Sequence, residues 1–171
     1  IDLKPLGWDH IKEDPDGNMT FQSGVTIEKI RFQEFNNRHH ALLHQICRDI
    51  AATPLRSMIT VGGEVIQCPY WANLPVYFLA ADANLVFMNR YEQEQCVTIR
   101  DYYDHPSSFN DLFLSSVSIS AEKTRLNSLY FNLKETDFDY STFNYLILYS
   151  GDFQQISIVL GGIQRYPIEC T

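Results

Sequence analysis

Apolar residues recur every three or four positions between residues 33 and 52, which is the clearest hydrophobic pattern in the chain. The spacing places them on one face of an amphipathic helix, and we expect Pro54 to end it, because proline cannot continue the helical hydrogen-bond ladder. The apolar stripe is wide for one helix, so we predict that it pairs with a second copy of the chain in a homodimer. The predicted dimerisation residues are Phe35, Leu42, Leu43, Ile46 and Ile50.

Strand-forming residues become more frequent beyond the two glycines at positions 62 and 63. The uninterrupted apolar run at 74–81 predicts a buried strand, and residues 82–84 predict a turn into an antiparallel strand at 85–88. Residues 89–114 lose the alternation and contain Pro106, which favours short helices and loops. Three further strands are expected at residues 126–133, 142–149 and 153–166, with a tight turn at 150–152.

This order of elements predicts a single α+β domain. We expect a five-stranded antiparallel sheet with short helices on one face, preceded in the chain by a long amphipathic helix that packs against the sheet or against a second copy. Residues 1–32 are interpreted as an irregular N-terminal lead-in, residues 33–69 as the helix and a connector, and residues 70–171 as the sheet domain.

The sheet domain resembles the PAS family of sensory domains. The resemblance is carried by residues 74–90, LPVYFLAADANLVFMNR, which are similar to the family's opening hairpin, and by the spacing of the later strands. It implies a sensory or regulatory domain of a signalling protein or transcription regulator, without catalysis, with a small apolar or aromatic ligand between the sheet and the short helices. The ligand-binding residues implied are Phe87, Asn89, Tyr103, Phe109, Phe113 and Tyr130.

A second resemblance is to the AlkB family of iron and 2-oxoglutarate dioxygenases. It is carried by residues 56–63, RSMITVGG, and by residues 89–91, 116–118 and 150–152. Those enzymes need a His-x-Asp pair and a distal histidine on iron. This chain has RDYYDH at 100–105 and no histidine after His105, so an AlkB relationship implies an inactive relative.

Two clusters of chemically capable side chains remain. His40, His44 and Cys47 share one stripe of the predicted helix, and their side chains are of types that bind metals. No fourth ligand is identifiable, so we predict no metal site. We also predict no catalytic residues. Asp101 and the neighbouring acid and imidazole groups are interpreted as caps of short helices. The sequence does not indicate whether the protein binds a cofactor, or which one.

Composition and charge exclude some functions. Thirteen Lys and Arg against 21 Asp and Glu give a net charge of −8, which argues against direct contact with nucleic acid. No apolar run is long enough to cross a bilayer, and four cysteines without a CxxC pair favour a reduced, cytoplasmic protein. Because the chain opens at Ile1, we expect further segments outside it. An acidic interaction or immunity protein with a basic partner is a remaining alternative.

Overall fold

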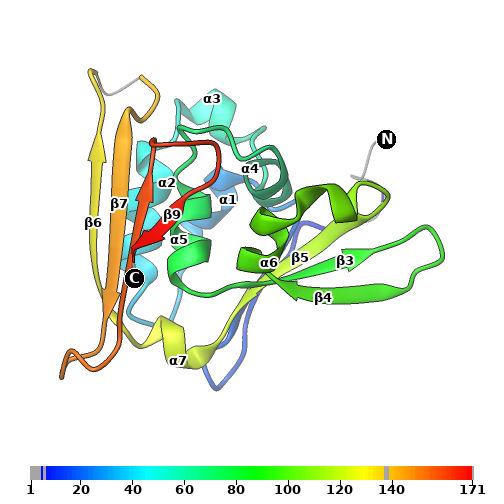
Figure 1. The fold of residues 1–171 in the computed structure, drawn as a ribbon, viewed down its shortest axis with the longest axis horizontal. Coiled ribbons are helices and arrows are strands. Elements are labelled where there is room, and N and C mark those ends of the chain that lie inside the picture. The colour runs from blue at the N-terminus through cyan, green and yellow to red at the C-terminus, as the bar shows by residue number, and fades with distance from the viewer. Residues whose placement is uncertain (1–4, 6, 137–138, 171) are drawn as a thin grey trace.

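Two antiparallel sheets enclose a layer of helices in the computed structural model, which describes residues 5, 7–136 and 139–170 (Figure 1). The first sheet has five strands in the order β1-β2-β5-β3-β4, and the second has four in the order β6-β7-β8-β9. The α+β prediction with antiparallel strands and short helices is confirmed, but the strands lie in two sheets instead of one. The helices are α1 (Ile27–Phe32), α2 (His40–Asp49), α3 (Thr53–Arg56), α4 (Val61–Gln67), α5 (Leu74–Ala80), α6 (Ile99–Asp104), α7 (Ala121–Thr124) and the 3-10 helix η2 (Pro106–Phe109).

The first sheet is organised around its central strand, β5. Strand β5 pairs with β2 on one side and with β3 on the other, so the N-terminal segment is part of the same sheet as the segment after residue 84. Met19 and Phe21 of β2 and Leu85 and Phe87 of β3 are fully or almost fully buried and alternate with more exposed residues, the pattern of a sheet covered on one face. The strands are β1 (Ile11–Glu13), β2 (Met19–Gln22), β3 (Asn84–Met88), β4 (Glu94–Thr98) and β5 (Phe113–Ile119).

The predicted strand at 74–81 is wrong, because these residues form helix α5. All seven residues of α5 are buried, and Pro75 stands in its first turn, where a missing N–H costs nothing. A helix surrounded by protein is apolar on every side and therefore has no amphipathic period to distinguish it from a buried strand. Strand β3 consequently pairs with β4 and β5, and not with residues 74–81.

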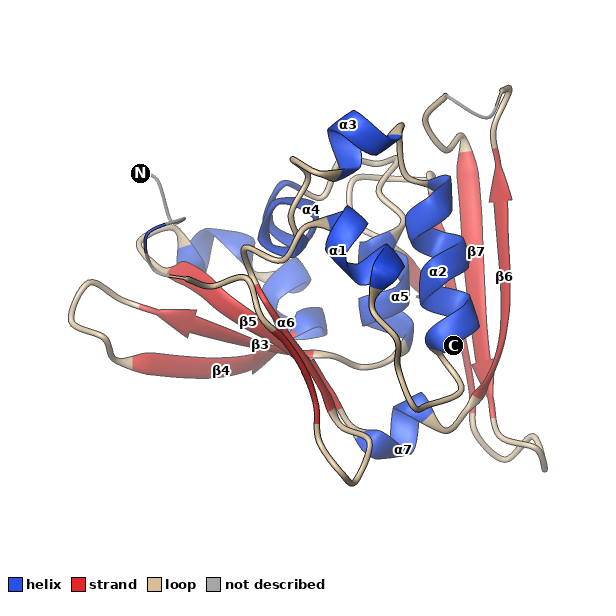
Figure 2. Cartoon of the chain, turned by 180° about the vertical axis from the view of Figure 1, so that it is seen from behind, coloured by secondary structure: helices blue, strands red, loops and turns tan. Residues whose placement is uncertain are grey.

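Helix α2 is shorter than predicted, and its apolar face packs inside the single chain while residues such as Gln45 and Arg48 remain exposed. It begins at His40 because the preceding backbone is held in a turn, in which the Asn37 side chain accepts from the N–H of His39 and His40 Nδ1 accepts from the N–H of Phe35. Figure 2 shows α2 and α5 packed between the two sheets. The five residues predicted for dimerisation are at most 7% exposed within the single chain, so the stripe forms intramolecular core.

The second sheet confirms two of the three late strands closely. Its strands are β6 (Asn127–Leu133), β7 (Phe143–Tyr149), β8 (Ile156–Gly161) and β9 (Ile168–Cys170). Strand β8 is shorter than predicted, because Phe153 (φ +57°) and Gly162 (φ +86°) take left-handed turn conformations on either side of it. The prediction that this segment lies in the same sheet as β3 is wrong, because the two strands belong to different sheets. Among the described residues, no helix has the length and apolar content needed to cross a membrane.

Candidate functional site

Helix α4 begins where the loop after β2 reaches it. Thr60 is its N-cap and accepts from the N–H of Gly63 at 3.1 Å. The N–H of Val61 donates to the carbonyl of Val25, and the N–H of Gly62 donates to the carbonyl of Ser23, both at 2.8 Å. The backbone donors at residues 61–63 are therefore all used within the chain.

Glu64, the next residue, points into the protein. The residue is 7% exposed, and its Oε2 atom has no hydrogen-bond partner among the described residues. Burial raises the pKa of the Glu64 carboxyl to about 7, partly offset by the N–H groups of Leu74 and Asn73 at the start of α5. The carboxyl lines a small, partly open cavity of about 40 Å³, together with Asp49, Trp71, Asn73, Asp139, Tyr140, Ser141 and neighbouring apolar residues.

Asn73 joins the helical layer to the second sheet. Its Oδ1 atom accepts from Asn144 Nδ2 at 2.7 Å, from Ser141 Oγ at 2.8 Å and from the Tyr130 hydroxyl at 3.2 Å. All four residues are at least nine-tenths buried, so this is a buried polar network that fixes α5 against β6 and β7.

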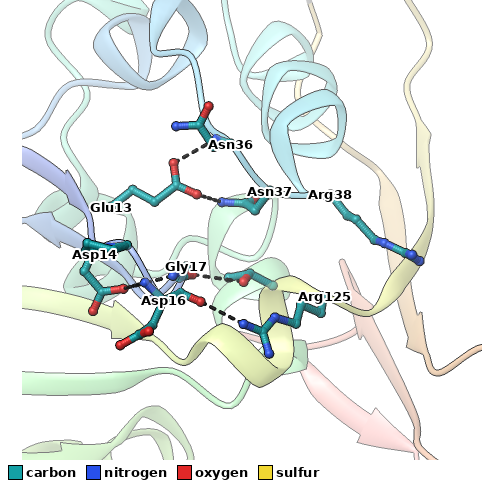
Figure 3. A pocket seen from close by; sticks show the side chains of 10 residues that line it. Glu13, Asp14, Asp16, Gly17, Asn36, Asn37, Arg38 and Arg125 are labelled. Carbon is teal, nitrogen blue, oxygen red and sulfur yellow. Dashed lines mark hydrogen bonds between the residues drawn. The ribbon is translucent and has the colours of Figure 1, made fainter.

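A cavity of about 660 Å³ lies between the β1–β2 turn, the segment before α2 and helix α7 (Figure 3). Two of its three acidic side chains, those of Glu13 and Asp14, already accept hydrogen bonds. Glu13 accepts from the backbone of Asn36 and the side chain of Asn37, and hydrogen bonds, first of all from Asn18, lower the pKa of Asp14. Arg125 donates to the carbonyl of Asp16. The carboxylates thus shape the loops and are poorly suited to hold an anion.

A third cavity, of about 460 Å³, lies beside exposed aromatic residues. Tyr70 packs edge-on against Trp71, with 4.7 Å between ring centroids. The opposite wall is the turn between β8 and β9, from Gly162 to Arg165. Such a wall of rings and amides suits a planar aromatic group.

The six residues implied as ligand-binding do not form one site. Phe87 and Phe109 pack together with Tyr102, Tyr103 stacks on Tyr166 at 4.6 Å, and Tyr130 binds Asn73. Asn89 accepts from the backbone of residues 91 and 93 in the β3–β4 turn, and Phe113 begins β5. None of the six lines the three cavities above. A role for single rings in ligand contact stays a prediction.

The two reactive clusters have local roles. The rings of His40 and His44 lie 4.4 Å apart, and Cys47 is buried in the core. Within the described ranges, no three His, Cys, Asp or Glu residues are arranged to hold a metal ion. Asp101 accepts from the hydroxyl of Thr98, the N-cap of α6, in agreement with the capping interpretation.

Sequence reasoning missed Glu64 and Asn73. The only available signal was a lone charged residue inside segment 59–66, which is otherwise uncharged. Asn73 gave none, because its partners at 130, 141 and 144 are far away in the sequence.

Comparison with known proteins identifies a family. Residues 1–119 match the family described as FAD binding domain in molybdopterin dehydrogenase. No curated protein matches the chain.

Solved structures with the same fold include two carbon monoxide dehydrogenases and a quinoline oxidoreductase. The carbon monoxide dehydrogenase of Hydrogenophaga pseudoflava that lacks the Mo-pyranopterin moiety has a TM-score of 0.81 at 15% identity, covering 96% of this chain and 58% of that one. Reconstituted CO dehydrogenase from Oligotropha carboxidovorans gives 0.78 at 19%, covering 95% and 58%. Quinoline 2-oxidoreductase from Pseudomonas putida 86 gives 0.77 at 14%, covering 94% and 57%. The chain thus spans less than three fifths of the length of these proteins.

These matches overturn the earlier functional interpretation. The PAS and AlkB resemblances are wrong, because residues 1–119 match a different family, and this range includes residues 74–90 and 56–63, which carried most of each resemblance. The prediction of a non-catalytic, homodimeric sensory protein for signal transduction or transcription regulation, with a small apolar or aromatic ligand, is wrong for the same reason. A buried hairpin and a wide apolar stripe are common to many α+β folds and carry little family information. The chain belongs to the family of FAD-binding domains of molybdopterin dehydrogenases.

Proposed function

We propose that this chain is the flavin domain of an oxidoreductase of the molybdopterin dehydrogenase type, and that it forms one wall of a FAD site shared with other polypeptide segments. The observation that carries the proposal is the family match over residues 1–119, which includes the whole first sheet and helices α1–α6. The likeness to CO dehydrogenase and quinoline oxidoreductase structures supports an enzymatic redox role.

The diphosphate of FAD does not fit the donors at the start of α4. A bound phosphate needs free N–H groups or cationic side chains. The N–H groups of Val61, Gly62 and Gly63 already donate within the chain, and the buried carboxyl of Glu64 follows directly.

The described cavities do not fit the complete cofactor either. The cavity of about 660 Å³ is lined by three carboxylates against two arginines, Arg38 and Arg125. The aromatic cavity has a single positive charge, at Arg165, and the cavity at Glu64 is only about 40 Å³. The described residues therefore do not hold FAD by themselves, and we derive no catalytic step through it. A shared site agrees with a chain that spans 57–58% of the relatives' length.

The test compares two preparations. We expect the protein purified from its own source to show the visible absorption of a flavin, bleached by dithionite, and the 171-residue chain to lose added FAD on gel filtration. Absence of flavin from the native preparation would overturn the redox function. Retention of one FAD by the 171-residue chain would leave the function intact and overturn the shared site.

We keep the cytoplasmic location as a proposal. All four cysteines are free in the structure, which suits a reducing compartment.

A further inference from the structure

The cavity of about 40 Å³ beside Glu64 has walls of two chemical kinds. Three carboxylate residues, Asp49, Glu64 and Asp139, line it, and so do the aromatic residues Trp71 and Tyr140, whose ring centroids lie 4.7 Å apart. Carboxylates and the faces of aromatic rings both attract cations. The wall is therefore suited to a positively charged group.

Glu64 is the group in this wall that needs a partner. Glu64 is only 7% exposed, and its Oε2 atom makes no hydrogen bond with the described residues. A buried carboxylate without a partner is costly, whereas a donor in the cavity would satisfy it. The carboxyl is thus an acceptor positioned for something outside the chain.

Two cations of the chain, Arg56 and Lys134, donate to backbone carbonyls of residues that line the cavity. The Arg56 guanidinium donates to Glu28 at 2.6 Å, to the hydroxyl of Thr53 at 2.7 Å and to the carbonyl of Ile50 at 3.0 Å. Lys134 donates to the backbone carbonyl of Asp49 at 2.9 Å. Neither residue lines the cavity.

The size and ligand set favour a monovalent organic cation over a metal. A divalent ion such as Ca²⁺ takes six to eight oxygen ligands, and the described residues contain no cluster of three His, Cys, Asp or Glu with metal-binding geometry. An ammonium group needs only a few acceptors and gains from the adjacent rings. A cavity of 40 Å³ admits a group of the size of a few waters at most.

We propose that the cavity formed by Glu64, Asp49, Asp139, Trp71 and Tyr140 binds a small primary ammonium cation, as the free ion or as the end of a slender amine. The site is distinct from the flavin function, and its test contains no flavin.

The experiment measures thermal unfolding of the 171-residue chain in four chloride salts at equal ionic strength, at about pH 8, where Glu64 is ionised. We expect ammonium and methylammonium to raise the unfolding midpoint saturably, and sodium and tetramethylammonium to leave it unchanged, because sodium is more costly to dehydrate and tetramethylammonium is too large. Equal midpoints in all four salts would overturn the proposal without the use of any variant.

Two variants locate the effect. We expect Glu64→Gln, which preserves volume, to weaken methylammonium binding measured by calorimetry by about tenfold or more. Tyr140→Leu, at a position that is 66% exposed and safe for folding, should weaken it by a few-fold. Asp152→Asn, a surface carboxylate change, is the matched control and should bind like the parent chain. Unchanged binding in both Glu64→Gln and Tyr140→Leu would show that any cation binds elsewhere and would overturn the site.

Discussion

Gly62 lies against the backbone of Ser23 so closely that a Cβ atom on Gly62 would be 2.8 Å from the Ser23 Cβ and 3.0 Å from the Ser23 carbonyl oxygen. The same carbonyl accepts the N–H of Gly62. The first sheet and helix α4 therefore meet through backbone contact, at a point where no side chain can be inserted without moving β2 or the helix.

Gly62→Ala should consequently destabilise the chain by about 1–3 kcal/mol, the usual cost of forcing an extra methyl group into a packed interior. Urea unfolding followed by circular dichroism measures this loss. Gly151→Ala is the control, because nothing lies within 4 Å of a Cβ there, and it should change stability by less than about 0.5 kcal/mol. Equal effects of the two changes would contradict the close approach.

Glu64 should make stability fall as pH rises. Its pKa is about 7 in the folded chain against an ordinary value of 4.5, so the folded state holds the proton more tightly than the unfolded state. The carboxyl costs nothing below about pH 4.5, and its full penalty, on the order of 3 kcal/mol, is reached above about pH 7. We expect Glu64→Gln to remove this part of the slope. Unfolding curves at about pH 5 and pH 8 measure it, and parallel pH profiles of the two proteins would refute the role of Glu64.

Asn73→Ala should destabilise the chain by about 2–4 kcal/mol, because it leaves the buried donors of Asn144, Ser141 and Tyr130 without their shared acceptor. Ser141→Ala, which removes one donor and leaves the acceptor with two, should cost about 1 kcal/mol. Chemical denaturation of both variants gives the comparison. A smaller loss for Asn73→Ala than for Ser141→Ala would mean that Asn73 is not the centre of the network.

Ile46→Ala should cost about 2–5 kcal/mol without any change in molecular mass, because Ile46 is fully buried within the single chain. Sedimentation measures the mass and urea titration the stability. Leu55→Ala, at a position that is 52% exposed, serves as the control and should be nearly neutral. If Ile46→Ala instead dissociated a dimer and retained full secondary structure, the intramolecular role assigned to Ile46 would be wrong.

The fold was predictable where the hydrophobic pattern has a period. Strand β7 alternates buried and partly exposed residues, whereas β6 buries only Tyr130 and exposes Leu129, Phe131 and Leu133. The bounds of both strands were found within a residue at each end. Helix α5 was not found, because a segment buried on all sides leaves no period. The division between the two sheets could not be read from the sequence either, since it depends on which strands pair and not on which residues are apolar.

The candidate site was less accessible to prediction than the fold. Glu64 is chemically unusual only because tertiary packing buries it, and the sequence alone does not distinguish a buried glutamate from a solvent-exposed one. Asn73 acquires its role from residues 57 to 71 positions later in the chain. Both features arise from packing, for which single-sequence patterns contain no signal.

The pairing of β2 with β5 also sets an order of events during folding. Met19 of β2 lies opposite Ile119 of β5, so this part of the first sheet closes only after a hundred residues of chain have been synthesised and brought together. The β6–β7–β8 meander, in contrast, joins neighbouring segments through short connections. Because closing long loops slows folding, we expect the last-synthesised sheet to acquire hydrogen-exchange protection first, while β1 and β2 wait for β5.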